Sequence, residues 1–201
     1  MTRIKICGLR TLADINSVNR YQPDYAGVLL SAGYRRSIPK AQACRMKAAL
    51  DPSIRMTGVF VNEEMDSVIS FVQEGVIDVI QLHGQESNEQ IDELRSRVSG
   101  IPVWKAFRVA GPEDVISAQE SHADLILLDS GTGTGKTFDW PLLSLAKRPY
   151  ILAGGLNPDN IGAAVASIHP YGVDTSTGVE TDGVKDAAKI RTFIEIVRKD
   201  S

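Results

Sequence analysis

The stretch YILAGGLNPDNIGAAVASIHPYGVDTSTG, residues 150–178, decides between two possible folds for this chain. It joins an apolar run ending in Gly-Gly to a segment of helical periodicity, and then to a second apolar run followed by Ser-Thr-Gly. Near-continuous apolar runs are typical of parallel strands that helices cover. In a closed (β/α)8 barrel, the loops after the last two strands commonly bind phosphate through backbone N–H groups. The stretch therefore favours a barrel over an open, doubly wound sheet.

The same unit of apolar run, turn residues and helical segment recurs along the whole chain. The other runs lie at residues 3–7, 25–30, 55–61, 78–83, 102–107 and 124–129. Alternating strands and helices indicate an α/β protein with a parallel sheet. Eight units predict one compact (β/α)8 TIM barrel domain over residues 1–201. The open sheet remains an alternative that counting alone does not exclude.

Helix starts are marked by capping signals. Ser87 and Gln90 have the spacing of a capping box. Asn157 followed by Pro158 predicts an N-cap with proline at the first helical position, and Pro112 predicts a second start of that kind.

Composition excludes several classes of protein. Hydrophobic residues make up 43% of the chain and charged residues 23%, with a formal net charge of −3, so no basic field favours a nucleic-acid partner. No apolar run approaches the roughly 20 residues of a membrane span, and the N-terminal segment lacks a signal-peptide pattern. Cys7 and Cys44 form no disulfide framework or metal-binding spacing. These features predict a reduced, cytoplasmic protein, and leave open whether it is a monomer or a homodimer.

The segment DSGTGTGKTFDW, residues 129–140, resembles a phosphate-binding P-loop without matching it. Gly135, Lys136 and Thr137 fit the end of that motif, but Ser130 stands where the first glycine is required. A nucleotide-binding regulatory module is therefore disfavoured. The glycines at 131, 133 and 135 instead predict a flexible loop in the sixth strand–helix connection, which we expect to close over a substrate.

Chemically useful side chains follow the predicted strands. Reactive groups of a barrel lie at the carboxyl ends of its strands. Those ends carry Cys7, Arg36, His83, Asp129, Gly154, Gly155, Asp174, Ser176, Thr177 and Gly178. Only one histidine is among them, so we expect no metal site. By residue type alone, Cys7 also fits a core position, Asp129 a loop cap and Arg36 a solvated surface charge.

An ordered series of motifs resembles one enzyme family along essentially the whole chain. KICG, GVFVN, VIQLHG, KAF, LLDS with GTGKTFDW, LAGGLNPDNI and GVDTSTGVE with GVKD occur in that order. This series is similar to the phosphoribosylanthranilate isomerases of tryptophan biosynthesis. The resemblance implies a (β/α)8 barrel that carries out an Amadori rearrangement without a cofactor. Its small-molecule substrate, N-(5′-phosphoribosyl)anthranilate, would become 1-(2-carboxyphenylamino)-1-deoxyribulose 5-phosphate.

The resemblance also implies roles for individual residues. Cys7 matches the general base of the family and Asp129 its general acid. Arg36 matches the arginine that meets the anthranilate carboxylate, although the loop around it departs from the family pattern. His83 and Asp174 fall near the substrate, and the phosphate-binding main chain matches Gly154, Gly155, Ser176, Thr177 and Gly178.

The chemistry places demands on the two proposed catalytic groups. Asp129 has to be protonated when it donates to the ring oxygen, and Cys7 has to lose its proton with a pKa below the usual value near 8.5. Lys5 lies two residues before Cys7, on the same strand face, so we expect its ammonium to stabilise the thiolate.

Other sugar-phosphate barrels are the main alternatives. A histidine-pathway aldose–ketose isomerase would show two phosphate signatures and an aspartate as base, whereas this chain has one clear signature and Cys7. Indole-glycerol-phosphate synthase would require lysines and a longer N-terminal segment that this sequence lacks. A barrel without activity that serves as a partner surface is disfavoured by the presence of both Cys7 and Asp129.

Overall fold

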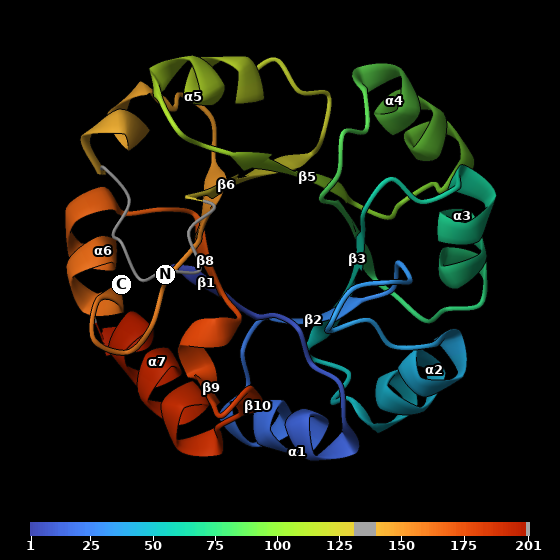
Figure 1. The fold of residues 1–201 in the computed structure, drawn as a ribbon, viewed down its shortest axis with the longest axis horizontal. Coiled ribbons are helices and arrows are strands. Elements are labelled where there is room, and N and C mark those ends of the chain that lie inside the picture. Colours follow the sequence, from blue (N-terminus) through green and yellow to red (C-terminus); the bar gives the residue numbers. More distant parts are fainter. Residues whose placement is uncertain (131–139, 200–201) are drawn as a thin grey trace.

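The computed structural model describes residues 1–130 and 140–199. Eight parallel strands pair in chain order, and the last strand pairs with the first to close a barrel (Figure 1). The predicted barrel is confirmed, and the open sheet is wrong. The strands are β1 (Arg3–Ile6), β2 (Tyr25–Leu29), β3 (Arg55–Phe60), β4 (Val79–Leu82), β5 (Val103–Arg108), β6 (Leu125–Asp129), β7 (Tyr150–Ala153) and β8 (Gly172–Thr175).

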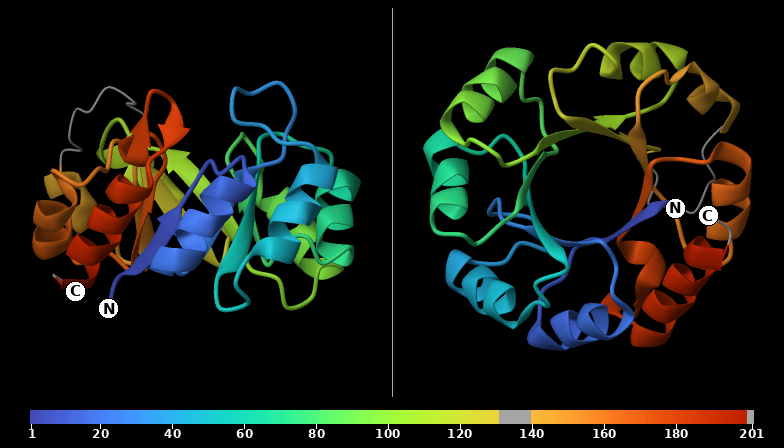
Figure 2. Two further views of the ribbon diagram at one scale, coloured as in Figure 1. Left: turned by 90° about the horizontal axis from the view of Figure 1, so that it is seen from below. Right: turned by 180° about the vertical axis from the view of Figure 1, so that it is seen from behind.

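Helices surround the barrel on its outside (Figure 1). They are α1 (Leu12–Tyr21), α2 (Lys40–Ala49), α3 (Met65–Gln73), α4 (Asn88–Arg97), α5 (Pro112–Ala118), α6 (Ile161–Ile168) and α7 (Ala187–Lys199), with 3-10 segments η1 (Trp140–Leu145) and η2 (Thr177–Val179). A small antiparallel hairpin of β9 (Glu180–Thr181) and β10 (Val184–Lys185) follows β8. In the side view of Figure 2, this hairpin and the β2–α2 loop project at the end of the barrel opposite both termini.

The hydrophobic core has two parts. The larger part packs the helices against the outside of the sheet, with residues such as Ile15, Phe60 and Phe193 fully buried. The smaller part fills the inside of the barrel and contains Tyr25 and Trp104, whose rings meet edge to face at 4.8 Å. Aromatic side chains therefore help to fill the barrel interior, which is a packed core in this fold.

The capping signals explain where several helices begin. Ser87 and Gln90 form the predicted capping box of α4, and Pro112 begins α5 as expected. The prediction at Asn157 and Pro158 is wrong, because α6 begins at Ile161. The residues after Asn157 form a turn instead, in which the Asn157 carbonyl accepts a hydrogen bond from the Ile161 N–H at 3.1 Å.

Glycines determine where β7 ends. The apolar run at residues 150–155 predicted a longer strand, but β7 stops at Ala153. Gly154 and Gly155 have φ angles of +93° and +66°, which lie in the left-handed region that glycine adopts at low cost. The chain consequently turns away from the sheet at the point where a ligand could approach its backbone.

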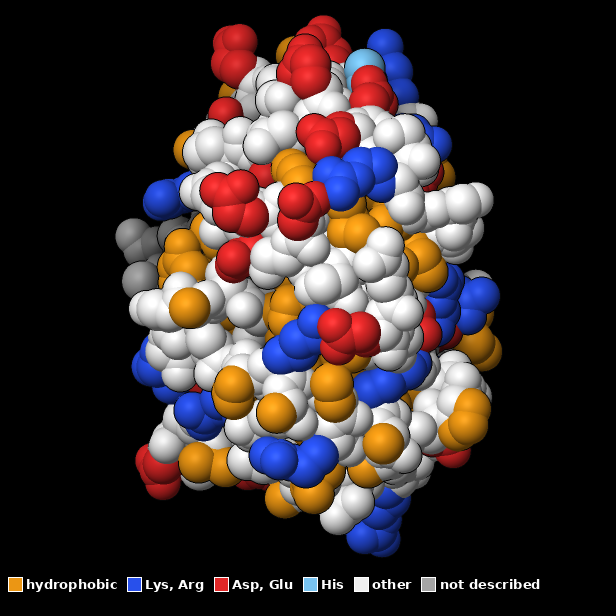
Figure 3. Space-filling view, turned by 90° about the vertical axis from the view of Figure 1, so that its right-hand side faces the viewer, with side chains coloured by type: hydrophobic (Ala, Val, Ile, Leu, Met, Phe, Trp, Pro, Cys, Tyr) orange, Lys and Arg blue, Asp and Glu red, His pale blue; other side chains and the backbone are white. Residues whose placement is uncertain are grey.

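The surface and the remaining loop complete the description. Acidic and basic side chains are interspersed on the face formed by α2, α3 and α4 (Figure 3). No helix within residues 1–130 and 140–199 is long and apolar enough to cross a membrane. The predicted flexible loop with Gly131, Gly133 and Gly135, together with Lys136 and Thr137, lies outside the described residues.

Candidate active site

A cavity of about 560 Å³ opens at the carboxyl ends of the barrel strands. Nine of the ten predicted site residues line it: Cys7, Arg36, His83, Asp129, Gly154, Gly155, Asp174, Ser176 and Thr177. These residues come from six different strand ends, so only barrel closure brings them together. Gly178 lies behind this wall, packed against the backbone of Leu156.

Cys7 follows β1 and is held by the neighbouring strand. Its N–H donates to the carbonyl of Thr175, the last residue of β8, at 2.8 Å. Its Sγ lies over Gly27 of β2, where an added Cβ would come within 2.8 Å of the sulfur. Gly27 is therefore needed to leave room for the thiol.

Lys5 and Asp174 form a buried ion pair inside the barrel, next to Cys7. Lys5 is 1% exposed, and its Nζ lies 2.9 Å from Oδ2 of Asp174. The other carboxylate oxygen, Oδ1, is buried and has no hydrogen-bond partner among the described residues. An unpaired buried acceptor in a cavity wall is suited to receive a donor from a ligand.

The pKa of Cys7 reflects two opposing influences. Burial raises the pKa of the thiol, and the nearby Lys5 ammonium lowers it. Burial outweighs Lys5, so the pKa of Cys7 lies above its ordinary value. The expected influence of Lys5 is present, but it does not by itself produce the low pKa that we expected from the sequence.

His83 and Asp129 approach each other across the cavity. The His83 Nε2 lies 3.7 Å from Asp129 Oδ2, and its Nδ1 lies 3.2 Å from the Gln81 amide nitrogen. Desolvation lowers the pKa of His83, and the negative charge of Asp129 opposes this effect. A neutral imidazole beside Asp129 is therefore favoured near neutral pH.

A second cavity of about 580 Å³ adjoins the first and shares His83 and Asp129 with it. Its wall contains another buried ion pair, in which Lys105 Nζ lies 2.7 Å from Glu86 Oε2. Burial raises the pKa of Glu86, but hydrogen bonds from Lys105, the Asn62 N–H and its own backbone N–H outweigh burial, so the pKa lies below its ordinary value. This pair fixes the loop that follows β4 and carries His83.

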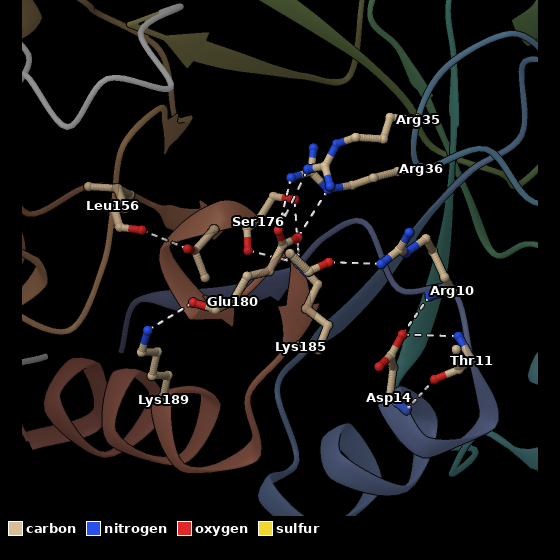
Figure 4. Close-up of polar contacts among 12 residues, drawn as sticks. Arg10, Thr11, Asp14, Arg35, Arg36, Leu156, Ser176, Glu180, Lys185 and Lys189 are labelled. Carbon is tan, nitrogen blue, oxygen red and sulfur yellow. Dashed lines mark hydrogen bonds and ion pairs between the residues drawn. The ribbon is translucent and has the colours of Figure 1, made fainter.

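Arg36 is largely buried and paired with a carboxylate, so it is not a solvated surface charge. Its side chain is 21% exposed, and its Nε and Nη2 donate to the two carboxylate oxygens of Glu180 at 3.0 and 3.1 Å. Lys185 also donates to Glu180 Oε1, at 2.9 Å, and to the Ser176 carbonyl at 2.8 Å (Figure 4). The positive charges of Arg36 and Lys185 thus stand beside the Ser-Thr-Gly segment.

Sequence reasoning missed the residues that support this site. Glu180 and Lys185 lie within the GVE and GVKD motifs but received no role. Gln81 of β4 also lines the cavity. It lies two residues before His83, and residues two apart on a strand point to the same face, so this spacing could have identified it. Within the described ranges, no group of three His, Cys, Asp or Glu side chains could hold a metal ion.

Comparisons with known proteins agree with this geometry. Residues 4–196 match the family model described as N-(5′-phosphoribosyl)anthranilate (PRA) isomerase. The N-(5′-phosphoribosyl)anthranilate isomerase of Endomicrobium trichonymphae is 44% identical over 203 residues, covering 98% of this chain and 99% of the relative.

Solved structures extend the similarity to three dimensions. The phosphoribosyl anthranilate isomerase of Thermotoga maritima superposes with a TM-score of 0.89 at 34% identity, covering 99% of this chain and all of that one. A phosphoribosyl anthranilate isomerase in complex with reduced 1-(o-carboxyphenylamino)-1-deoxyribulose 5-phosphate superposes with a TM-score of 0.86 at 33% identity and covers 99% of this chain and 100% of its own. The family model and these similarities span nearly the whole chain. The chain therefore belongs to the N-(5′-phosphoribosyl)anthranilate isomerase family.

Proposed function

We propose that the protein is a phosphoribosylanthranilate isomerase that converts N-(5′-phosphoribosyl)anthranilate into 1-(2-carboxyphenylamino)-1-deoxyribulose 5-phosphate in tryptophan biosynthesis. One observation carries the assignment of residues. Cys7, which follows β1, and Asp129, which ends β6, line the same cavity. Arg36 and the loops that follow β7 and β8 line this cavity too. A substrate lying between these strand ends would have a base and an acid on different sides.

Asp129 is the proposed general acid in the first step. Its carboxyl group donates a proton to the furanose ring oxygen as the bond from that oxygen to C1′ breaks. The product is an open-chain Schiff base with a protonated nitrogen. His83 lies close enough to orient the Asp129 carboxyl. Because its lowered pKa favours the neutral ring, His83 adds no positive charge to that of the Schiff base.

Cys7 is the proposed general base in the second step. Its thiolate removes the proton from C2′, and the electron pair forms a C1′–C2′ double bond while neutralising the nitrogen. Reprotonation at C1′ and loss of the hydroxyl proton then give the amino ketone. The cationic Schiff base adds a positive charge to that of Lys5, which lowers the pKa of Cys7 when it is needed.

The remaining predicted residues bind and orient the substrate. Gly154, Gly155, Ser176, Thr177 and Gly178 would hold the phosphate through their backbone. The unpaired Oδ1 of Asp174 is suited to accept a hydrogen bond from a sugar hydroxyl, and Arg36 would receive the carboxylate. Fixing both anionic ends of the substrate places the reacting carbons between Cys7 and Asp129.

A fluorescence assay on freshly generated phosphoribosylanthranilate tests the proposal. We expect the wild type to consume the fluorescent substrate, and Cys7→Ala and Asp129→Asn each to lose at least about 100-fold in kcat. Cys44→Ala is the matched control, because Cys44 packs against the outer core and is absent from the cavity wall. Full activity in Cys7→Ala or Asp129→Asn would remove that residue from its role, and an inactive wild type would overturn the function.

We also propose that the reaction takes place in the cytoplasm. The mechanism requires a free thiol, and both cysteines of the chain are free. A reducing compartment would preserve that state. Fractionation of cells followed by immunodetection of the protein checks this assignment.

A further inference from the structure

Glu180 is the centre of a charged cluster that lies beside the cavity and is not part of its wall. Its side chain is 7% exposed, and both of its oxygens accept hydrogen bonds from Arg36 (Figure 4). A bidentate pair of this kind fixes the plane of the guanidinium as well as its position. Arg36 lines the cavity, whereas Glu180 lies behind it, so Glu180 acts on the cavity through Arg36.

The pairing leaves one edge of the Arg36 guanidinium available. A guanidinium has five N–H donors in a rigid fork, and Glu180 uses those on Nε and one side of Nη2. Within the part of the chain that the structure describes, no hydrogen bond uses the edge formed by Nη1 and the other side of Nη2. That edge has the geometry for a second bidentate bond to a carboxylate.

The carboxylate of Glu180 is itself held in place. Lys185 Nζ lies 2.9 Å from Oε1 and is 3% exposed on its side chain, and Glu180 and Lys185 are partners in the β9–β10 hairpin. Lys189 of α7 donates to the Glu180 carbonyl at 2.8 Å. Arg10 donates to the Gly183 carbonyl at 2.8 Å, which ties the hairpin turn to the loop after β1 (Figure 4).

The contact with Gly8 is independent evidence that the position of the Arg36 side chain is fixed by its neighbours. An added Cβ at Gly8 would lie 2.7 Å from Arg36 Cδ and 2.7 Å from Ser176 Oγ. The stem of Arg36 therefore passes over a residue with no side chain and beside the proposed phosphate loop. The Arg36 side chain is confined by Gly8 on its stem and by Glu180 at its head.

We propose that Glu180 is a positioning residue for substrate recognition: it holds Arg36 so that the remaining guanidinium edge receives the carboxylate of the anthranilate ring. This inference rests on the proposed function. Glu180 thereby determines the preference of the site for a carboxylated aromatic amine over one that lacks the carboxyl group.

Binding of two matched ligands tests the inference by calorimetry. The first is reduced 1-(o-carboxyphenylamino)-1-deoxyribulose 5-phosphate, and the second is the same compound without the carboxyl group. We expect Glu180→Gln to lower the preference for the first ligand by about tenfold or more, with affinity for the second within about twofold of wild type. Glu180→Asp keeps the charge but retracts the carboxylate by one methylene, and should show an intermediate preference.

Two further variants show whether Glu180 acts through Arg36. In an Arg36→Met background, which removes the proposed carboxylate contact, Glu180→Gln should cause no further loss of preference. Glu195→Gln is the matched control, because Glu195 pairs with Arg191 on the exposed surface of α7. It should retain the wild-type preference.

The outcomes separate the two proposals. An undiminished preference in Glu180→Gln, or tighter binding of the carboxylated ligand, overturns the positioning role and leaves the proposed function intact. If Glu180→Gln does not fold, Glu180→Asp decides, and an unchanged preference there overturns the role. A wild type that binds neither ligand overturns the proposed function and this inference together.

Discussion

Lys5 and Asp174 are register partners on β1 and β8, and their side chains form an ion pair of 2.9 Å at the junction that closes the barrel. The pair lies 169 residues apart in the chain and is almost entirely buried. It joins fold and site, because the same lysine lowers the pKa of Cys7 and the same aspartate lines the cavity.

Removing the lysine should shift the titration of the thiol. Lys5→Met removes a positive charge that stabilises the thiolate, so the pKa of Cys7 should rise further above its ordinary value. The rate of alkylation by iodoacetamide, measured against pH with Cys44 replaced by alanine, gives that pKa. Lys105→Met removes another buried lysine, and we expect it to leave the Cys7 titration nearly unchanged. An unshifted profile in Lys5→Met would contradict the role of Lys5.

The same variant should be much less stable. Lys5→Met leaves the Asp174 carboxylate buried without its partner, and breaking a buried pair in this way costs about 3–5 kcal/mol. Urea unfolding at pH 7 measures the loss. Arg191→Met, which breaks the exposed pair with Glu195, should leave the free energy of unfolding nearly unchanged. Equal losses in the two variants would contradict the assignment of the Lys5 pair to a buried environment.

Glu180 should give the protein a measurable sensitivity to acid. Bonds from Arg36 and Lys185 outweigh desolvation and lower the pKa of Glu180 from 4.5 to about 2. Between these pH values the unfolded chain binds the proton more strongly, so stability rises with pH across this window. The stabilisation is fully present above about pH 4.5 and is lost as the pH falls towards 2.

Urea unfolding at a series of pH values between 2 and 5 tests this prediction. The slope of unfolding free energy against pH should be shallower in Glu180→Gln than in the wild type. The Glu195→Gln variant should keep the wild-type slope. A wild-type slope in Glu180→Gln would mean that its carboxylate is not preferentially stabilised in the folded protein.

Gly178 should be required for phosphate binding for steric reasons. A Cβ at this position would overlap the carbonyl oxygen of Leu156, a backbone atom that cannot move aside alone. Gly178→Ala should therefore displace the loop after β8 and raise the inhibition constant of inorganic phosphate by about tenfold. Gly111→Ala, where an added Cβ would meet no atom within 4 Å, is the control. Unchanged inhibition in Gly178→Ala would exclude this loop from the phosphate site.

Much of the fold could be predicted because its signals are local. Apolar runs gave all eight strands, and the Ser87–Gln90 capping box and Pro112 marked helix starts. The start of α6 could not be read in this way, because Asn157 caps a turn as readily as a helix. The run at 150–155 extended past the real strand for a similar reason, since glycines with positive φ interrupt it.

The site was predictable as a set of positions, but its electrostatics were not. Strand ends place Cys7 and Asp129 on one cavity as expected. The pKa of Cys7 depends on how burial compares with the charge of Lys5, which spacing along the strand does not reveal. The partnership of Arg36 with Glu180 joins residues 144 positions apart, and no local pattern indicates it.

The bond from the Cys7 N–H to the Thr175 carbonyl has a consequence for the newly made protein. Cys7 is synthesised long before β8, the strand whose carbonyl holds it. Contacts of such long sequence separation form late and slowly. The nascent chain therefore has to keep β1 unpaired on one side until β8 emerges, and activity should begin only after β8 has left the ribosome.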